Sequence, residues 1–552
     1  MTPPVRPWGP AGWAVVALAF AAGFALFPLR VVGPGLDHLP GDLVDSRLNN
    51  YVLEHGYRWL TGLVPGFWDA PMFYPARGIT AYSDAHIGML PVYAGLRAMG
   101  LSSESAYQGW FLVPFALNFA SCAWAVRRLG WGPAAAAAGA YLFAFGLPLA
   151  TSVTLHAQLG PRFLVPPALV LAWEWAWSPA TRRLGWLAVC AVGQTYLTLY
   201  VGYFLGLVLF IQSAVVAVAF RRALPWGELL RPGRRQWAGR LAVAVIAVVM
   251  LLPLFVPHLL AGREHGHYPL ETLRAFCPTV QSWLTPADLA CHRDWTNTLF
   301  PVPSDSEYTC EKQLFPGLVP VVALVIGLFL FHRRPVAGVS AVVVLLAVAL
   351  TTRVGDHALY DPLLHLPGVA GIRSVGRVVL VLLFPLAVLV AALIDELRRY
   401  GWLAALTVLG LLIADQSLLT QGGPRGEDWA AFRYPKVEAV TRRECLAELI
   451  RRHPNPRLVY VFPDPEGDTI ASLVRQVDAM RASQELGLPT VNGWSGYWPP
   501  GWEMFADYGS LFRWLTEDQR TGLVVIGEPV GSGDDPEFES RMRARFPPLP
   551  FP

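Results

Sequence analysis

The sequence predicts an α-helical polytopic membrane protein that carries a small α/β domain after its last span. Of the 552 residues, 54% are hydrophobic and only 15% are charged, which is not the composition of a soluble domain. Apolar runs long enough to cross about 30 Å of hydrocarbon recur through residues 1–420. In residues 421–552, short apolar segments instead have the pattern of buried strands beside one helix.

Eleven apolar segments are expected to span the membrane. The first lacks the short apolar core and the small-residue cleavage pattern of a removable signal peptide, so we expect it to remain as an anchor. The eleven segments lie at about 11–32, 106–126, 132–152, 162–178, 184–200, 201–220, 240–260, 314–331, 335–352, 375–396 and 401–420.

Arginine pairs beside the spans indicate the orientation of the chain. Because basic residues next to short loops stay in the cytoplasm, the pairs should all lie on one side. They fall at alternate ends of the spans, which predicts a cytoplasmic N-terminus and an extracytoplasmic C-terminal domain in the cytoplasmic (inner) membrane. The net charge of +3 gives no reason to expect nucleic-acid binding. The pairs are Arg127/Arg128, Arg182/Arg183, Arg221/Arg222, Arg333/Arg334 and Arg398/Arg399.

The first large outer loop, 33–105, is expected to contain two surface-lying helices, at about 43–62 and 84–99. In the first helix, apolar residues recur at helical spacing and form one face. The opposite face is polar. The apolar residues are Val44, Leu48, Val52, Trp59 and Leu63, and the polar ones are Asp45, Arg47, Asn49, Asn50, Glu54 and Arg58.

The chain is thus predicted to have two domains, a transmembrane domain at 1–420 and a soluble extracytoplasmic α/β domain at 421–552. The transmembrane domain has two further outer loops, at 261–313 and 353–374. In the second domain, LVYVFPD (458–464) and GLVVIGE (522–528) predict buried strands, and residues 469–485 predict a helix.

Three cysteines, Cys277, Cys291 and Cys310, share the second outer loop, where the compartment permits disulfides. Because three is odd, at most one bridge is expected, and the sequence does not decide which pair forms it. Cys122 and Cys190 lie within spans, as small apolar packing residues. No cysteine spacing resembles a zinc site.

Two carboxylates open the first outer helix. Asp42 is placed to cap that helix, and Asp45, three residues on, is placed to favour the helix dipole. Capping is one interpretation. The other is a functional site, because two carboxylates, Arg47 and two asparagines are more polar than a helix start requires.

The second outer helix begins with SDAH (83–86). Ser83 or Asp84 could cap it, with His86 in its first turn. Asp84 and His86 are therefore candidates to support the site, with capping as the alternative interpretation.

Basic groups gather near the other outer loops. In LHAQLGPRF (155–163), His156, Gln158 and Arg162 have no carboxylate beside them in the sequence, which suits a phosphate, although Arg162 could instead reach lipid headgroups. A second basic motif contains Arg373 and Arg377, which lie four residues apart on one face at the start of a span and could bind an anion there, with headgroup anchoring as the alternative. The last candidate is Glu311, which precedes another span beside Lys312. It could equally be a simple surface charge.

These candidates predict an outward-facing cavity at the level of the lipid headgroups. Carboxylates line one wall, and arginines with a histidine line the other. Such a layout suits a reaction that joins a lipid phosphate to a polar acceptor, because cations can hold the leaving phosphate while a carboxylate takes a proton from the attacking hydroxyl or amine.

The sequence resembles the GT-C superfamily of membrane glycosyltransferases, and more closely a group of bacterial GT-C-like proteins related to the YfhO-like group. The resemblance covers nearly the whole chain and is more specific for fold than for substrate. The motifs that carry it are GDLVDSRLNNYVLEHG (41–56), FWDAPMFYP (67–75), LHAQLGPRF (155–163), QTYLTLYVGYF (194–204), EKQLFPG (311–317), GIRSVGR (371–377) and VNGWSGYWPP (491–500).

The resemblance implies an inverting transferase that takes a sugar from a polyprenyl-phosphate carrier. Asp45 and Asp42 match the acidic motif that acts as base or aligns the acceptor, and Asp45 is favoured because Asp42 is the better cap. Arg373 and Arg377 match basic residues near the lipid phosphate. His156 and Arg162 match less closely. A divalent cation, Mg or Mn, serves some members only.

The tail lacks a WWDYG-like motif, which speaks against asparagine glycosylation. Its aromatic segment VNGWSGYWPPGW (491–502), with Trp494, Tyr497 and Trp498, could stack on an acceptor glycan or could dock the tail onto the membrane domain or its interface.

Two other functions remain open from the sequence. A non-catalytic protein of the same fold would bind lipid-linked glycans without turnover. A transporter of lipids or glycans would also have many spans, although neither paired interrupted repeats nor a charge near the middle of a span is evident.

Overall fold

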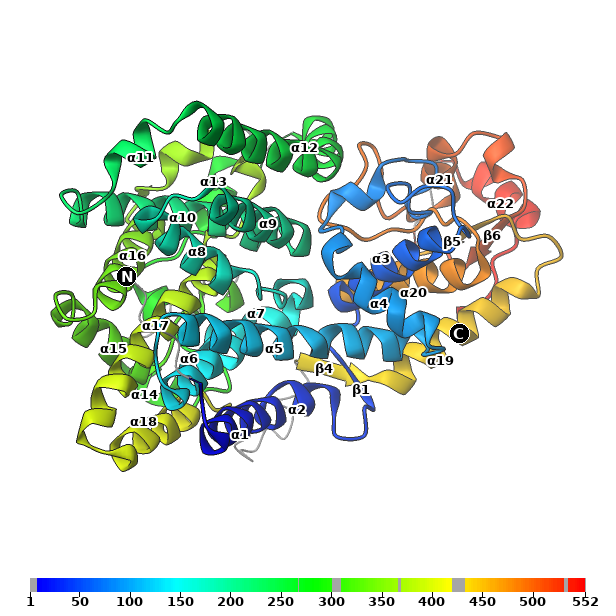
Figure 1. Cartoon of the computed structure of the whole chain (residues 1–552). Helices are drawn as coiled ribbons and strands as arrows, with labels where there is room; N and C mark the ends of the chain where they lie inside the picture. Colours follow the sequence, from blue (N-terminus) through cyan, green and yellow to red (C-terminus); the bar gives the residue numbers. More distant parts are fainter. Residues whose placement is uncertain are drawn as a thin grey trace. The chain divides into compact units, whose positions relative to one another are not determined.

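A computed structural model describes residues 7–266, 268–299, 309–365, 369–418, 432–530 and 535–551. They belong to two compact units, each built from separate parts of the chain (Figure 1). The helical unit comprises Met1–Pro34, Trp110–Leu254 and His267–Trp429, and the mixed unit comprises Gly35–Gly109, Phe255–Gly266 and Ala430–Pro552.

Within the described part of the chain, six helical stretches are long and apolar enough to cross a membrane, so the chain is a membrane protein with multiple spans. Each coincides with a predicted span. They are Pro10–Val32, Ser103–Arg128, Pro133–Thr154, Leu199–Ala219, Arg234–His265 and Val375–Tyr400. The other five predicted spans stay predictions, and so does the orientation of the chain. These five spans coincide with shorter helices of 12 to 17 residues: α8 (Val165–Trp177), α9 (Thr181–Leu197), α15 (Leu318–Phe329), α16 (Pro335–Thr351) and α18 (Trp402–Asp415).

Helix α17 (Val379–Leu397) is the centre of the helical unit, where α6 (Pro133–Phe145), α10 (Leu199–Ala219), α15 and α16 pack around it (Figure 1). The stretch that contains it is apolar all round, with a mean hydropathy of 2.9, and 89% of it is buried. Small residues let α6 approach α17 closely. A Cβ at Gly139 would lie 3.0 Å from the Ala387 carbonyl oxygen.

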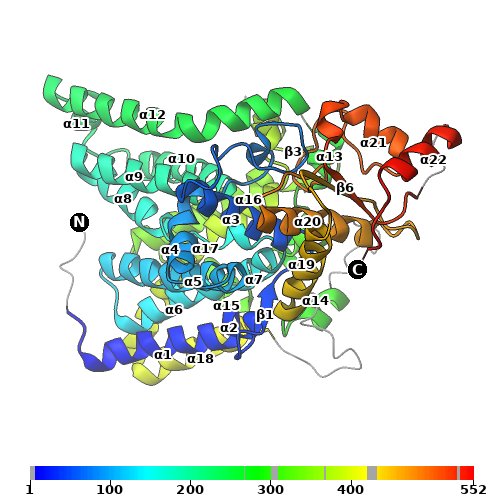
Figure 2. The ribbon, with the colours of Figure 1, turned by 90° about the vertical axis from the view of Figure 1, so that its right-hand side faces the viewer.

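Helix α12 (Arg234–His265) is nearly as apolar as α17 but has the opposite surroundings. Its mean hydropathy is 2.6, yet only 6% of its apolar stretch is buried. The part within the helical unit runs along the edge of that unit in both views (Figures 1 and 2). Because water does not suit such a surface, lipid tails are its natural neighbours.

The remaining short elements of the helical unit connect these helices. They are α2 (Pro28–Val32), which follows α1 (Pro10–Leu26), α7 (Leu147–Leu155), η3 (Ala157–Leu159), α11 (Trp226–Leu230), α13 (Leu270–Ala275), η4 (Gln281–Leu284), α14 (Arg293–Leu299), η5 (Thr309–Lys312), β2 (Arg353–Val354), which pairs with β3 (His357–Ala358), η6 (Asp361–His365), η7 (Val369–Gly371), η8 (Val375–Val378) and η9 (Arg398–Tyr400).

In the mixed unit, the strands and the helix predicted in the C-terminal tail are present. Strands β5 (Leu458–Val461) and β6 (Leu523–Ile526) pair in parallel, and α20 (Thr469–Leu486) packs on β5. The tail also pairs with the first loop, because β4 (Arg433–Pro435) lies antiparallel to β1 (His38–Pro40). A soluble domain limited to 421–552 therefore stays a prediction.

The other helices of the mixed unit come from both ends of the chain. They are α3 (Asp45–Leu60), η1 (Ile79–Tyr82), η2 (Ile87–Met89), α4 (Leu90–Ala98), the start of α5 (Ser103–Arg128), α19 (Lys436–Arg451), α21 (Tyr508–Trp514), η11 (Asp518–Arg520) and α22 (Pro536–Arg545).

Helix α3 is buried on both faces, which differs from the predicted surface helix. Every residue from Ser46 to Gly56 is buried, including the polar side chains, whereas Trp59 and Leu63 at its end are exposed. The polar side chains tolerate burial because other segments of the unit supply their partners, and the sequence pattern alone does not reveal those partners.

The second predicted outer helix also begins later than expected. Residues Ser83 to His86 are not helical, and α4 starts only at Leu90. His86 has a φ of 53°, in the left-handed region, so it does not lie in a first helical turn.

No disulfide links Cys277 and Cys291, and both are free thiols. The side chain of Cys310 lies outside the described part of the chain, so the predicted bridge stays a prediction for pairs that include it. Cys122 and Cys190 are buried within helices, as expected.

We expect Arg47→Met to destabilise the mixed unit by about 3 kcal/mol, because a buried carboxylate loses its close partner. Arg47 Nη2 lies 2.5 Å from Asp478 Oδ1, and both side chains are at most 3% exposed. The free energy of unfolding in detergent, followed by tryptophan fluorescence, measures the change.

Arg442→Met is the matched control for that experiment. Arg442 contacts the same Asp478 at 3.4 Å from a half-exposed position, so its loss should cost less than about 1 kcal/mol. Equal effects of the two substitutions would contradict the expected role of burial.

Candidate functional site

Glu311 contacts three polar side chains from two other segments of the helical unit. It accepts a hydrogen bond from Ser374 Oγ at 2.6 Å, and Arg377 contacts both of its oxygens, at 2.5 and 3.3 Å. His156 Nε2 lies 3.3 Å from it. We call His156, Glu311, Ser374 and Arg377 the Glu311 cluster.

The electrostatics of this cluster keep Glu311 ionised. Burial alone would raise the pKa of Glu311, but Arg377 and His156 hold that pKa well below its usual range. The interpretation of Glu311 as a simple surface charge is therefore wrong, since its carboxylate is the common partner of the cluster.

A glycine lets the segment of Arg377 approach the segment of Glu311 closely. A Cβ at Gly376 would lie 2.9 Å from the backbone oxygen of Glu311, closer than a real Cβ contact. The glycine in GIRSVGR thus permits η8 to approach η5. This close approach is what places Arg377 beside the Glu311 carboxylate.

Arg373 and Arg377 have different surroundings, although the sequence placed them on one helical face. Arg373 precedes η8, and the α-helix begins only at Val379, so the two arginines do not share a face of an α-helix. Arg377 is 6% exposed and lies over the Tyr200 ring at 4.3 Å. Its charge is already compensated by Glu311.

Arg373 is half-buried and carries an uncompensated charge. Its guanidinium lies over the rings of Phe276, at 4.7 Å, and Tyr268, at 5.6 Å. Within the described ranges, no carboxylate forms an ion pair with it. Cation–aromatic contacts hold the side chain in position while leaving its hydrogen-bond donors for another group.

The assignment of Arg162 to phosphate binding is wrong. Its side chain has no exposed surface, and its guanidinium donates to the carbonyl oxygens of Leu380, at 2.6 Å, and Phe143, at 2.5 Å. The loop folds inward, because Asn118 bonds the backbone of Gly160 and of Arg162. Burial also excludes the alternative in which Arg162 reaches lipid headgroups.

The other two candidates of that loop are nearer the surface. His156 follows the end of α7 and belongs to the Glu311 cluster, and Gln158 is half-buried in η3. Sequence analysis missed Ser374 and Tyr200. Ser374 lies between Arg373 and Arg377, and Tyr200 lies in the motif QTYLTLYVGYF. Their position within these motifs was the signal that could have pointed to them.

Asp42 has the capping role that its position suggested. Its Oδ1 accepts hydrogen bonds from the backbone N–H groups of Val44 and Ser46, each at 3.1 Å. Burial raises the pKa of the Asp42 carboxyl, and the nearby negative charge of Asp45 raises it further. The carboxyl therefore ionises less readily than a free aspartate.

Asp45, in the first turn of α3, contacts the aromatic segment of the tail. Trp494 Nε1 donates a hydrogen bond to Asp45 Oδ1 at 2.6 Å. Two of the three glycines of this segment pack against the first loop. A Cβ at Gly493 would overlap the Phe73 ring, and a Cβ at Gly496 would lie 2.8 Å from the backbone carbonyl oxygen of Tyr82. The aromatic segment thus docks within the mixed unit.

Its other aromatic residues complete this packing. Tyr497 stacks on His265 with 5.1 Å between ring centroids, and Trp498, 37% exposed, packs edge-on against Trp502 at 5.1 Å. This arrangement favours the docking interpretation. Trp498 keeps one exposed aromatic surface.

The remaining candidates of the first outer loop are Arg47, His86 and Asp84, and two of them are held by other residues of the mixed unit. Arg47 is held by Asp478. His86 is buried, and its Nε2 bonds Asn49 Oδ1 at 3.0 Å. Burial lowers the pKa of His86, despite the opposing charge of Asp84. Asp84 caps no helix, and its Oδ2 is buried without a hydrogen-bond partner among the described residues.

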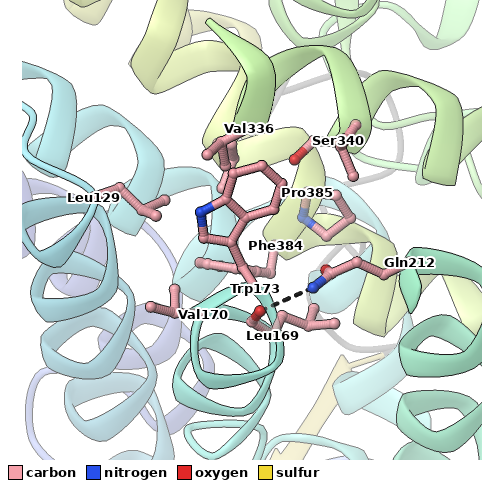
Figure 3. A pocket seen from close by; sticks show the side chains of 11 residues that line it. Leu129, Leu169, Val170, Trp173, Gln212, Val336, Ser340, Phe384 and Pro385 are labelled. Atoms are coloured by element: carbon pink, nitrogen blue, oxygen red, sulfur yellow. Dashed lines mark hydrogen bonds between the residues drawn. The ribbon is translucent and has the colours of Figure 1, made fainter. Parts of the chain in front are cut away.

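A very small cavity lies within the helix bundle at the level of α8, α10 and α17 (Figure 3). Its volume is about 20 Å³, enough for about one water molecule. Gln212 reaches into it and donates to the Leu169 carbonyl oxygen at 2.9 Å. A lipid-linked sugar does not fit there.

Across the described ranges, no three histidine, cysteine, aspartate or glutamate side chains gather as a metal site would require. We therefore assign no step to a divalent cation.

No protein-family model matches the sequence, and no curated protein matches it. Solved structures that match at low sequence identity include an oligosaccharyltransferase, an arabinofuranosyltransferase and ArnT. AglB, the archaeal oligosaccharyltransferase from Archaeoglobus fulgidus, solved with an inhibitory peptide and a dolichol-phosphate, matches with a TM-score of 0.46 and 11% identity, over 88% of this chain and 64% of that one.

Two further structures are similar at the same low level. The arabinofuranosyltransferase AftD from Mycobacteria has a TM-score of 0.46 and 13% identity, over 83% of this chain and 30% of that one. ArnT from Cupriavidus metallidurans, in the apo state, has a TM-score of 0.34 and 14% identity, over 98% and 89%. The chain thus spans less than two thirds of AglB and of AftD. These likenesses concern the fold and assign no residue a role.

We expect Asp42→Asn to stabilise the mixed unit at neutral pH. The amide oxygen can still cap α3, and the cost of ionising a buried carboxyl disappears. Because the pKa of Asp42 is raised in the folded state, protonation of this carboxyl stabilises the folded wild type. This stabilisation is fully present below the unfolded pKa of about 3.9 and is lost as the pH rises through the folded pKa. The unfolding temperature from pH 4 to 7 measures it.

Asp69→Asn provides the control, because the exposed Asp69 also accepts a backbone N–H, from Gly78 at 2.9 Å. A pH dependence of unfolding in Asp42→Asn that equals that of the wild type would exclude Asp42 as its source.

Proposed function

We propose that this protein is a membrane glycosyltransferase that moves a sugar from a polyprenyl-phosphate carrier to an acceptor on the outer side of the cytoplasmic membrane. The observation that carries the proposal is the pair of arginines before α17. One is neutralised by Glu311, and the other, Arg373, is held by aromatic rings with its donors available for an anion.

The position of these arginines suits a lipid phosphate. They lie at the start of a stretch that is long and apolar enough to span the membrane, where a phosphate attached to a lipid chain would lie. With Glu311 pairing Arg377, the two arginines retain about one positive charge in excess, which matches a phosphate group. An arginine can bind such a group through two parallel hydrogen bonds.

The same charge would favour reaction over mere binding. When the bond between the sugar and the phosphate breaks, the phosphate takes the bonding electrons and gains negative charge. Arg373 would then bind the departing polyprenyl phosphate more strongly than the intact donor. This difference lowers the barrier, because only interactions that strengthen in the transition state accelerate a reaction.

A base must accept the proton of the attacking hydroxyl, and we assign this role to Asp45. The acceptor oxygen forms a bond to the anomeric carbon, the phosphate leaves, and the carboxylate takes the proton, which is consistent with inversion at the sugar. Asp42 is assigned to hold the start of α3, because its Oδ1 serves two backbone N–H groups there.

We expect Arg373→Gln to weaken binding of polyprenyl phosphate at least about tenfold, since the loss of a charged hydrogen bond costs more than about 1.4 kcal/mol. Native mass spectrometry of the purified protein with polyprenyl phosphate and polyprenyl-phosphate monosaccharides measures this. Arg333→Gln, at an exposed arginine on another loop, is the matched control. Binding no stronger than that of ordinary phospholipids, or equal in both variants, would contradict the donor site.

We expect Asp45→Asn to reduce transfer by about 10² to 10⁴-fold, which is the usual contribution of a general base. The amide oxygen can still accept the Trp494 hydrogen bond, so the local fold should persist. Release of polyprenyl phosphate from each donor, with cell-envelope extract as acceptor, measures the rate, and Asp69→Asn is the control.

Full transfer in Asp45→Asn, in Asp42→Asn and in the double variant would remove the proposed base. Selective donor binding with no release in any form of the protein would favour the non-catalytic glycan-binding function instead.

A further inference from the structure

The mixed unit contains a polar cavity of about 260 Å³, separate from every residue discussed above as part of the candidate site. Its walls come from α3, from the end of α4, from the start of α5 with Ser102 before it, and from α19 and α20, and all of these parts belong to the mixed unit. The lining residues are Glu54, Arg58, Arg97, Ser102, Ser103, Glu104, Arg443, Arg481, Gln484 and Glu485.

Ion pairs hold most of this lining in fixed positions. Glu104 Oε1 pairs with both Arg443 and Arg481, and Arg481 also donates to Ser103 Oγ at 2.9 Å. On the opposite side, Arg97 donates to both oxygens of Glu54, at 2.8 and 3.1 Å. A cavity lined by side chains that are already held in place is preorganised, so little conformational entropy would be lost on binding.

Three buried polar atoms of the lining have no hydrogen bond among the described residues: Glu104 Oε2, Arg58 Nε and Arg443 Nε. Arg443 Nε nevertheless lies 2.7 Å from Glu485 Oε2, as part of an ion pair. Glu104 is 3% exposed. Arg58 Nε lies 3.9 Å from Glu54 Oε1, which is an ion-pair distance but too long for a hydrogen bond. An unsatisfied buried acceptor and an unsatisfied buried donor are each costly, and a group that both donates and accepts, such as a hydroxyl, would satisfy them.

The charges of the lining add a second requirement. Four arginines face three glutamates, which leaves one positive charge in excess. A ligand with one negative charge would balance it in a partly enclosed space, where charge interactions are stronger than in water. The volume suits one sugar ring rather than a chain.

We propose that this cavity binds a single acidic sugar unit, a ring with hydroxyl groups and one anionic group, carried as a carboxylate or as a phosphate ester. The hydroxyl groups bond Glu104 and Ser103, and the anionic group lies by Arg58 and Arg481. The proposal concerns binding alone, so it holds or fails independently of the transfer reaction proposed above.

The test is calorimetric titration of the full-length protein in detergent. The probes are glucuronate and glucose 6-phosphate, with glucose, acetate and inorganic phosphate for comparison. We expect glucuronate or glucose 6-phosphate to bind saturably and at least tenfold more tightly than glucose, acetate and phosphate. The two acidic sugars distinguish the carboxylate from the phosphate ester.

Variants at the cavity connect binding to its lining. Arg58→Gln removes the excess charge and should weaken binding at least tenfold. Arg451→Gln removes an arginine that contacts Glu485 from outside the cavity, at 50% exposure, and should leave binding unchanged.

Ser102 offers a second pair of variants that retain the fold. Its Oγ accepts the backbone N–H of Ser105 at the start of α5, and both aspartate and asparagine can take over this cap. Ser102→Asp, which adds a negative charge, should weaken binding at least tenfold, whereas Ser102→Asn should not.

Three outcomes would overturn the proposal. The first is the absence of saturable binding of either acidic sugar. The second is binding that Arg58→Gln and Ser102→Asp leave unchanged. The third is that inorganic phosphate binds as tightly as the acidic sugars. In that case the cavity would bind small anions without recognising a sugar.

Discussion

The pairing of Glu311 with Arg377 is the interaction on which the polar end of the helical unit depends. A buried carboxylate needs cations and hydrogen-bond donors, so the loop before α15 and the η8 segment before α17 must meet. Gly376 makes the meeting sterically possible. Arg377 is neutralised in this way, whereas Arg373 contacts aromatic rings and forms no ion pair within the described ranges, and the proposed function rests on this difference.

The mixed unit follows the same rule with other residues. Arg47 pairs with Asp478, and Glu104 pairs with Arg443 and Arg481, so charges of the first loop are buried against charges of the C-terminal tail. These contacts join segments more than 300 residues apart in the sequence. They explain why α3 can be polar and buried at once. The proposed sugar cavity lies where this pairing is incomplete, which is where a ligand has polar groups to bind.

The carboxylates at the start of α3 show how structural and chemical roles can lie three residues apart. One carboxylate oxygen of Asp42 accepts two backbone hydrogen bonds at the start of α3, and burial beside Asp45 raises the pKa of Asp42. Asp45 is positioned by Trp494, a residue of the tail. The tail therefore does more than cover the first loop, since it orients the carboxylate that we assign as base. Helix, loop and tail contribute to one arrangement that none of them could form alone.

The sequence by itself determined the membrane class, the six longest spans, the strands and helix of the tail, and the position of the polar motifs, because hydropathy and periodicity are local properties. It did not distinguish α17 from α12, which are almost equally apolar, although one is buried in protein and the other is not. It also placed Arg162 at a phosphate and α3 at a surface. Only the tertiary structure decided these points, because the carbonyl oxygens that bind Arg162 and the carboxylate that pairs with Arg47 come from distant segments, and burial depends on what those segments supply.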